Sequence, residues 1–540
     1  MFGVGAGTRA RRWRAATVIA VAGLAAALLG AAPSGAVAAT GTPAISWEMK
    51  KRLVGDGYRY TELAFPKTAV VQLRCKSVPG AKQYLWSGSG VKATPPAKVR
   101  PEALEERIER SRGGSLPPLP CETTATVPIG APTVVSLRVR LQNDAVTAVR
   151  SVTIRPRDYL IVSMGDSYAS GEGAPEVPQQ FDLAGYVSRG PVWSDTPCHR
   201  SARSGPSQAV ADLERADPHS TVTYVHLACS GSVIENSGPF RGRGGLLSED
   251  KAADHCCPEM KIAPQMDAQP GQIDGQLEQI QSRATAAGRQ IDALLISAGG
   301  NDSGFVPFVM SCSMDILDPF GPSCIDDAYV NPKYAPLKPF THHVRDALYG
   351  GVDSEGKAFD GIAGKLNRVK EKVVDILGPD ALERTYLTGY PDLLEGQTGA
   401  GLLLLGITPA EATWATNNIL SVINQELKND RGWNFIDVGP KFANHGAARG
   451  GARWLNWFTD ALLTQGPIPK LCSWRTITAS AMLGLGALAA FPCGASLLGW
   501  LKDVDRYITK GILHPNELGQ RAIADAIVEA VKPDLPEYGR

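Results

Sequence analysis

Short, mostly apolar strands separated by helix-length segments constrain the fold of this chain more than any other feature. Residues 159–162 (YLIV) have no polar face, and similar runs occur at residues 291–296, 385–387 and 435–438. A strand without a polar face is expected where helices cover both sides of a parallel sheet. The alternation of such strands with helical segments predicts an α/β domain, with functional groups on loops at the carboxyl ends of its strands.

Residues 40–157 show a different pattern, that of short antiparallel strands. From residue 135 to residue 142 (VSLRVRLQ), apolar and polar residues alternate, so one face of the strand is buried and the other is solvated. Asn143-Asp144 then supplies a turn, and a second run reaches Ile154, which completes a hairpin. We expect a small β-sandwich of immunoglobulin-like type here, and assign it no chemistry because it lacks clustered acids, bases or nucleophiles.

The N-terminus carries the pattern of an export signal. Residues 1–39 hold four arginines, then an uncharged Ala/Val/Leu run over residues 15–32, then small residues at a cleavage site between Ala38 and Thr40. This order of segments describes a secretory signal peptide, with an uncleaved membrane anchor as the alternative. An Arg-Arg pair in the segment leaves Sec and Tat export both open. We therefore expect a secreted, extracellular protein.

Charge and composition exclude several classes of protein. With 44% hydrophobic and 20% charged residues, the chain can bury a large core, which excludes global disorder. Its formal net charge is +1, and it becomes −3 when the four arginines of residues 1–39 are removed with the signal peptide. Without an excess of positive charge, a dedicated nucleic-acid-binding function is not expected.

The ten cysteines are expected to form disulfides once the chain reaches an oxidising compartment. The sequence does not determine their connectivity, and we predict pairing between nearest neighbours. The predicted pairs are Cys75–Cys121, Cys198–Cys229, Cys312–Cys324 and Cys472–Cys493. Cys256 and Cys257 stay open, either joined to each other or bonded elsewhere, and the spacing around them does not favour zinc.

Four motifs lie where the loops of a parallel sheet would place functional groups. The first, Gly165-Asp166-Ser167, follows the strand at residues 159–162 and would project a hydroxyl into a cleft. Taken alone, that serine is equally well explained as the N-cap of a helix. The other motifs are Cys229-Ser230-Gly231-Ser232 after residues 222–227, Gly299-Gly300-Asn301-Asp302 after residues 294–296, and Leu513-His514-Pro515-Asn516 before a C-terminal helix.

Together, and in this order, the motifs resemble those of the SGNH hydrolases, also called the GDSL-type lipase and esterase family. The resemblance covers about residues 158–535 and is greatest to the secreted, disulfide-bonded bacterial esterases of that family. It implies a three-layer α/β/α, flavodoxin-like hydrolase domain over residues 158–540, preceded here by the β-sandwich. It also implies hydrolysis of carboxylic esters by a serine nucleophile, without a metal or an organic cofactor.

The resemblance gives each motif a role. Ser167 would attack the ester carbonyl, and His514 would take its proton and later return it to the leaving alkoxide. Three donors would hold the oxyanion: the backbone N–H groups of Ser167 and Gly231, and the side-chain amide of Asn301. Glycine suits position 231 because no Cβ obstructs the substrate oxygen.

The sequence departs from the family pattern beside the histidine. Many members have Asp three residues before it, but position 511 is Gly. Either the Gly511 backbone carbonyl accepts the proton on the second imidazole nitrogen, or Asp503 or Asp505 supplies a carboxylate. We favour the carbonyl, because a more distant carboxylate would need a special loop path. For Asp166 and Asp302 we expect local hydrogen bonds, and for Glu172 a structural or solvated role.

An apolar insertion lies between the last two sites. Residues 476–501 contain no charge over 26 positions, which taken alone is long enough to span a membrane. Pro492 and four glycines interrupt the run, and a crossing would separate the predicted nucleophile from its base. We therefore expect a lid-like insertion over about residues 454–501, held by Cys472 and Cys493, that lines an acyl pocket or docks on a lipid interface. Ordinary core packing is the alternative.

These features predict a secreted serine esterase or lipase that cleaves lipid or other acyl esters through a Ser-His acyl-enzyme mechanism. We expect a monomer whose partner is a small ester or lipid, with transient contact at a lipid interface as an option, and no nucleic acid. Within the enzyme class, the alternative is a carbohydrate O-acetylesterase. From another class, the alternative is a catalytically silent cell-wall or adhesion protein, although each catalytic position holds a chemically competent residue.

Overall fold

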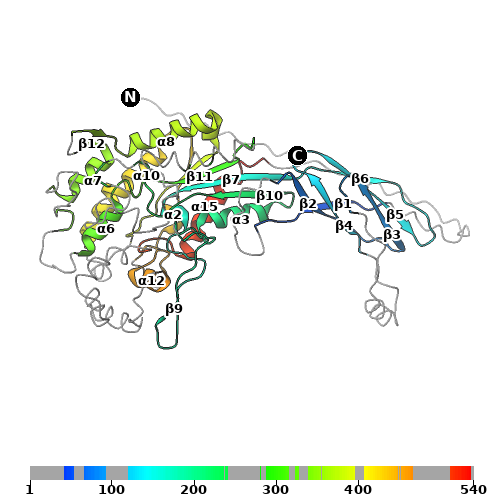
Figure 1. Cartoon of the computed structure of the whole chain (residues 1–540), viewed down its shortest axis with the longest axis horizontal. Helices are drawn as coiled ribbons and strands as arrows, with labels where there is room; N and C mark the ends of the chain where they lie inside the picture. The colour runs from blue at the N-terminus through cyan, green and yellow to red at the C-terminus, as the bar shows by residue number, and fades with distance from the viewer. Residues whose placement is uncertain are drawn as a thin grey trace, which may run out of the picture.

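The computed structural model describes residues 42–53, 66–92, 120–196, 198–235, 238–240, 276, 280, 288–314, 323–326, 338–353, 356–395, 407–447, 449, 452–465 and 511–536. Figure 1 shows an elongated molecule, with strands β1 to β6 at one end and a larger α/β part at the other. Several predicted features lie outside the described residues: the signal peptide, residues 466–501 of the lid-like insertion, Asp503, Asp505, Cys256, Cys257, Cys472 and Cys493.

The N-terminal part is built from two three-stranded antiparallel sheets, in the orders β1-β2-β4 and β3-β5-β6. Val71 and Val127 of the first sheet share a hydrophobic cluster with Val135 and Ile154 of the second, and all four are fully buried. The predicted hairpin is confirmed as β5 and β6, and two sheets over one core form a β-sandwich. Its immunoglobulin-like type stays a prediction. The strands are β1 (Ile45–Met49), β2 (Thr68–Cys75), β3 (Ala81–Gly88), β4 (Glu122–Pro128), β5 (Thr133–Leu141) and β6 (Arg150–Ile154).

The larger part contains a five-stranded parallel sheet in the order β10-β7-β11-β14-β15. The predicted apolar strands at residues 159–162 and 385–387 lie within β7 and β14, which confirms an α/β protein with a parallel sheet. In chain order the strands run 2-1-3-4-5, a doubly wound arrangement whose switch point lies between β7 and β11. The strands are β7 (Arg157–Gly165), β10 (Ser220–His226), β11 (Ala293–Ser297), β14 (Thr385–Thr388) and β15 (Asn434–Ile436).

Helices lie on both faces of this sheet (Figure 1). Helices α3 and α15 pack against each other on one face, while α8 and α10 lie on the other. None of the helices in the described segments combines the length and the apolar character that crossing a bilayer requires. The elements used below are α2 (Ser167–Ser170), β8 (Gln180–Phe181), β9 (Val187–Arg189), α3 (Gly205–Ala216), α6 (Phe305–Met314), α8 (Ile362–Leu377), α10 (Ser421–Lys428), α12 (Phe458–Thr464) and α15 (Glu517–Val531).

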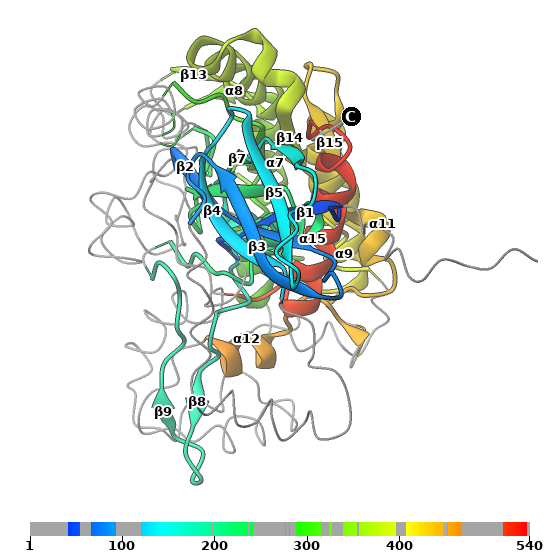
Figure 2. The ribbon, with the colours of Figure 1, turned by 90° about the vertical axis from the view of Figure 1, so that its right-hand side faces the viewer.

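The end of β1 and the chain that follows it connect the β-sandwich to the α/β part. The Met49 N–H donates to the Pro218 carbonyl at 2.7 Å, just before β10. The buried Glu214 of α3 accepts from the Leu53 N–H at 2.8 Å. The two parts therefore share hydrogen bonds in addition to the covalent connection between β6 and β7. Figure 2 shows the sandwich in front of the larger part, with the β8–β9 hairpin projecting away from both.

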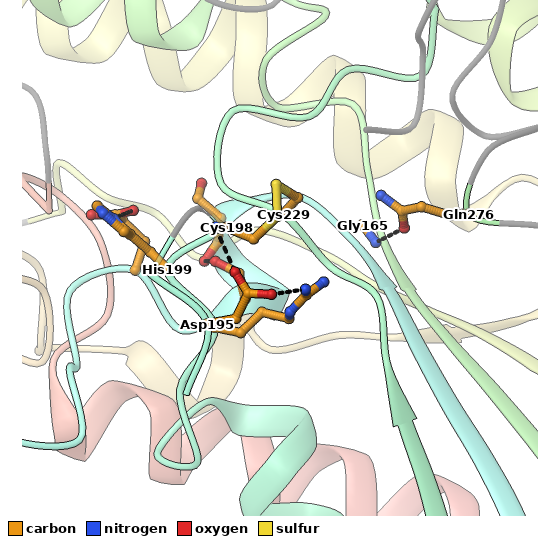
Figure 3. Close-up of a disulfide and its surroundings, with 10 residues drawn as sticks. Gly165, Asp195, Cys198, His199, Cys229 and Gln276 are labelled. Atoms are coloured by element: carbon orange, nitrogen blue, oxygen red, sulfur yellow. Dashed lines mark hydrogen bonds and ion pairs between the residues drawn. A yellow bond between two sulfur atoms is a disulfide. The ribbon is translucent and has the colours of Figure 1, made fainter. Parts of the chain in front are cut away.

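Three disulfides lie within the described residues: Cys75–Cys121, Cys198–Cys229 and Cys312–Cys324. They match three of the four pairs expected from the sequence. The bond between Cys198 and Cys229 joins the segment before α3 to the loop after β10 (Figure 3). Cys312 and Cys324 lie close to Glu411, but sulfurs already joined in a disulfide are not thiolates that could bind a metal.

Candidate active site

Ser167 follows the end of the interior strand β7, where the chain changes direction sharply. Gly165 has a φ of 128°, and a Cβ there would lie 2.1 Å from the Ser297 carbonyl oxygen, so only glycine fits. Asp166 then caps α2, its side chain accepting the Tyr168 N–H at 3.0 Å. Because Asp166 is the N-cap, the interpretation of Ser167 as a capping residue is wrong. The Ser167 hydroxyl is therefore available for a hydrogen bond with another side chain.

That partner is His514. Its Nε2 lies 2.8 Å from the Ser167 Oγ, although 347 positions separate the two residues. The loop that carries His514 is held by Asn456, whose N–H donates to the His514 carbonyl and whose carbonyl accepts the Leu513 N–H, both at 2.9 Å. Asn516 then caps α15 and fixes the exit of the loop. The structure therefore brings the predicted nucleophile and base within hydrogen-bond distance.

The acceptor on the other side of the His514 ring is not the predicted one. The His514 Nδ1 lies 2.9 Å from the carbonyl oxygen of Ile512. The Gly511 carbonyl accepts the backbone N–H of His514 at 3.3 Å, so it is engaged in the turn and not with the ring. The prediction of Gly511 was therefore wrong by one residue, although a backbone carbonyl does orient the imidazole. With Nδ1–H donating to Ile512, Nε2 is free of a proton and can accept one.

Two of the three predicted oxyanion donors, Gly231 and Asn301, lie on neighbouring loops. Asn301, after β11, donates a side-chain hydrogen to the Ser232 carbonyl at 2.7 Å. This bond holds the Asn301 loop against the turn in which Gly231 takes a φ of 84°. An amide nitrogen carries two hydrogens, so Asn301 can donate to a second oxygen. Asn301 also borders the same cavity as Ser167.

A cavity that is partly open to solvent adjoins the Ser167–His514 pair. Most of its lining side chains are aliphatic or aromatic, and several come from α6 and α10. Such a lining suits an acyl or alkyl chain better than a polar group. The lining residues are Asp166, Ser167, Tyr168, Gly300, Asn301, Phe305, Val309, Tyr390, Leu393, Leu420, Ile423, Ile512, Leu513 and His514.

Burial lowers the pKa of the His514 imidazole below 6.5, because the imidazolium form loses its hydration. The Glu172 carboxylate and the Ile512 carbonyl oppose this shift, whereas the charge of His199 adds to it. His514 is therefore neutral at neutral pH. A neutral imidazole is the form that can take the proton of Ser167.

Asp166, which precedes the serine, is buried and binds Tyr390. Burial raises the pKa of Asp166 to about 6, although the hydroxyls of Tyr390 and Ser297 donate hydrogen bonds to its carboxyl group. The Tyr390 hydroxyl also accepts the Gly300 N–H at 3.0 Å. These bonds link the Ser167 loop to the Asn301 loop. The sequence shows Tyr390 only as part of a Gly-Tyr-Pro motif after a strand, so its contact with Asp166 was missed.

Asp302 follows Asn301 and forms a buried ion pair. The Lys365 Nζ of α8 lies 2.8 Å from its Oδ1, with the two side chains 2% and 0% exposed. Asp302 also accepts the Ile234 N–H at 2.8 Å, from a residue 68 positions away, so the expectation of local hydrogen bonds was wrong: its partners lie on distant segments. Lys365 was missed, because a lysine in a helical pattern gives no sign that it points inward.

Glu172, for which a structural or solvated role is expected, is buried and ion-paired. Its Oε2 lies 2.7 Å from the His199 Nδ1, and the His199 ring stacks on Trp193 at a centroid distance of 4.5 Å. Figure 3 shows His199 beside the disulfide between Cys198 and Cys229. A solvated Glu172 is thus excluded, and its carboxylate is held inside the protein close to the His514 loop.

No protein-family model matches this chain, and no curated protein matches it. Among solved structures, it is similar to phospholipase A1 from Streptomyces albidoflavus, with 16% identity and a TM-score of 0.33 over 70% of this chain and 99% of that one. A family two carbohydrate esterase from Clostridium thermocellum gives 12% identity and a TM-score of 0.24 over 85% of this chain and 100% of that one. Structural similarities this distant give no information about function, so the function must be inferred from the site itself.

Proposed function

We propose that this chain is a secreted serine esterase or lipase that cleaves carboxylic ester bonds through an acyl-enzyme. The observation that carries the proposal is the 2.8 Å contact between Ser167 Oγ and His514 Nε2 beside an apolar cavity. A serine hydroxyl within hydrogen-bond distance of a neutral, oriented imidazole is the arrangement that nucleophilic catalysis requires. The disulfides within the described residues support export to an oxidising compartment.

In the proposed reaction, the Ser167 Oγ attacks the ester carbonyl carbon while His514 Nε2 takes the hydroxyl proton. The tetrahedral intermediate then collapses, the bond to the alcohol oxygen breaks, and the alcohol leaves with the proton from His514. Water attacks the resulting acyl-enzyme, again giving its proton to His514. The bond between the acyl carbon and the Ser167 Oγ then breaks, His514 returns the proton to Oγ, and the carboxylic acid leaves.

The developing oxyanion would be stabilised by the N–H groups of Ser167 and Gly231 and by the second amide hydrogen of Asn301. Asn301 is already fixed by its bond to Ser232, so little reorganisation would accompany the reaction. An Asn301→Ala variant should lose about a hundred- to a thousandfold in kcat with a smaller change in KM. Unchanged kcat would remove Asn301 from the mechanism.

The lining of the cavity supports an acyl-chain substrate over an acetylated carbohydrate. Phe305, Val309 and Ile423 would contact a chain of several methylenes, each of which gains about 0.8 kcal/mol on burial. Activity on p-nitrophenyl esters should therefore be higher for medium-length acyl chains than for acetate. A steep fall with chain length would instead favour the carbohydrate O-acetylesterase.

The direct test uses Ser167→Ala beside a matched control, Ser421→Ala, at an exposed serine on α10. A fluorophosphonate should label wild type and Ser421→Ala but not Ser167→Ala. Ester hydrolysis should fall at least about a thousandfold only in Ser167→Ala. Equal labelling or equal rates in the two variants would defeat the enzyme hypothesis and leave the silent cell-wall or adhesion protein.

The domain organisation of the proposed enzyme follows the change of pattern between β6 and β7. We place the sandwich at residues 40–157 and the hydrolase domain at residues 158–540. Among the residues of the sandwich that the structure describes, none lines the cavity beside Ser167. We therefore propose that the sandwich supports the α/β part through the hydrogen bond between Leu53 and Glu214, and that it has no role in the reaction.

A further inference from the structure

Glu172 follows the nucleophile helix α2 and keeps a negative charge inside the protein. It is 2% exposed, pairs with His199 at 2.7 Å and accepts a hydrogen bond from the Gln465 amide. The side chain of Ser230 is a further hydrogen-bond partner. Burial alone would raise the pKa of Glu172, but the charge and hydrogen bond of His199 hold it well below its usual range. The carboxylate is therefore ionised at neutral pH.

The backbone beside Glu172 packs against the His514 loop. A Cβ on Gly173 would lie 2.9 Å from the His514 Cβ, so the two segments are in direct contact. The Gly173 carbonyl accepts a hydrogen bond from the Asn456 Nδ2 at 2.8 Å, and Asn456 bonds the backbone of the His514 loop. The Gly173 N–H donates to the Gln465 Oε1 at 2.9 Å. The carboxylate thus has a fixed position relative to the proposed base.

Gln465 also connects the carboxylate to the start of the His514 loop. Its Nε2, which donates to Glu172, would lie 2.6 Å from a Cβ on Gly511. Any side chain at position 511 would displace the amide that holds Glu172. The glycine therefore serves two purposes: it permits the φ of 80° that the turn requires, and it leaves space for Gln465.

We propose that Glu172 is a positioning residue that stabilises the protonated form of His514 during acyl transfer, an inference that rests on the proposed esterase function. The Ile512 carbonyl orients the imidazole, but a carbonyl carries no net charge. When His514 takes the proton of Ser167 it becomes a cation. In a buried site, a nearby anion stabilises a cation far more strongly than it would in water.

Glu172 and His199 act on His514 in opposite directions. Besides burial, which has the largest effect and lowers the pKa of His514, Glu172 raises that pKa and His199 lowers it. Removal of either charge should therefore move the titration of His514, and the two removals should move it in opposite directions. If Glu172 and His199 had only a structural role, their removal would not shift the His514 titration in opposite directions. The other titratable groups that line the cavity with His514 are Asp166, Tyr168 and Tyr390.

The test is a His514 titration by NMR on histidine-labelled full-length protein without substrate, with the signal assigned by a His514→Gln variant. In Glu172→Gln the midpoint should fall by about one pH unit, and in His199→Gln it should rise. The acid limb of kcat/KM should move the same way. Less stabilisation of the imidazolium should lower kcat of Glu172→Gln about tenfold, with KM nearly unchanged.

Glu176→Gln is the matched control, since Glu176 lies on the same loop but accepts from the Ala202 N–H, away from His514. It should leave the His514 midpoint unchanged. If Glu172→Gln does not fold, the His199→Gln variant is the test. An upward shift of the His514 midpoint then supports the proposal, and an unchanged midpoint overturns it. Midpoints that stay at the wild-type value, or move in the same direction in both variants, overturn it as well. Because the titration needs no turnover, its outcome is separate from failure of the wild type to hydrolyse esters.

Discussion

The Tyr168 hydroxyl donates a 2.7 Å hydrogen bond to the carbonyl of Leu513, so the residue after the proposed nucleophile holds the residue before the proposed base. Leu513 has a φ of 57°, a left-handed conformation that is unfavourable for a residue with a Cβ. The surrounding contacts must therefore stabilise it. The Tyr168 ring also lies 5.4 Å from the His514 ring. One side chain thus fastens the two loops whose separation sets the Ser167–His514 distance.

Tyr168→Phe should weaken this connection without changing the packing of the ring. We expect kcat to fall about three- to tenfold, the range that the loss of one hydrogen bond allows, with little change in KM. Steady-state kinetics on a soluble ester will measure it. Tyr186→Phe, at an exposed tyrosine between β8 and β9, is the control. Identical kcat values for the two variants would show that the Tyr168 hydroxyl does not position the base.

The activity should depend on pH through His514. Only the neutral imidazole can accept the Ser167 proton, so kcat/KM should rise with pH and then level off. Because burial lowers the pKa of His514, the midpoint of that rise should lie below 6.5. A profile from pH 4 to pH 9 will locate it, and the same profile for Asp166→Asn will show whether the neighbouring carboxyl contributes. A midpoint at pH 7 or above would contradict the argument.

The parts of the fold that could be predicted from the sequence are those with local signals. The apolar run at residues 159–162 has the unbroken burial of a central strand, and the alternation that begins at residue 135 has the period of a half-buried one. The sheet order was accessible only through the family resemblance, because strand order depends on contacts between distant segments. The pairing of Cys198 with Cys229 could be proposed from proximity in sequence alone.

The dependence on contacts between distant segments also explains which residues of the site could be predicted from the sequence. Ser167 and His514 stand in short motifs on loops, so they could be named before their 2.8 Å contact was known. Ile512 could not be distinguished from Gly511 as the acceptor, because that choice depends on the turn geometry of two adjacent residues. Gln465 has no motif, and its contact with Glu172 arises only when α12 packs beside the nucleophile loop. Residues that act through packing leave no local pattern.

Asp166→Asn should change how stability depends on pH. Burial raises the pKa of Asp166 to about 6 from an ordinary value of 3.8, so the folded state holds this proton more tightly than the unfolded state. The resulting stabilisation is present below pH 3.8 and is lost as pH rises through about 6. It amounts to about 3 kcal/mol. Between pH 4 and pH 7, the free energy of unfolding of Asp166→Asn should therefore rise by about that amount relative to wild type.

Urea unfolding of oxidised protein at the two pH values will measure this difference. The exposed Asp430 provides the control, since Asp430→Asn should follow the wild-type dependence. If the unfolding free energy of Asp166→Asn has the same pH dependence as that of wild type, the pKa of the Asp166 carboxyl is not raised in the folded state. The contacts with Tyr390 and Ser297 would then stabilise the ionised form fully.

Lys365→Met should show whether the buried ion pair supports the loop of Asn301. Removing the ammonium leaves the Asp302 carboxylate buried and without its ion-pair partner, which typically costs about 3–5 kcal/mol in the free energy of unfolding. Lys372→Met, at an exposed lysine of the same helix, should cost little. Because Asp302 also binds the Ile234 N–H beside the Gly231 turn, kcat of the folded Lys365→Met protein should fall with the stability. Equal unfolding free energies for the two lysine variants would mean that the pair contributes no net stability, and that other contacts hold Asn301 in place.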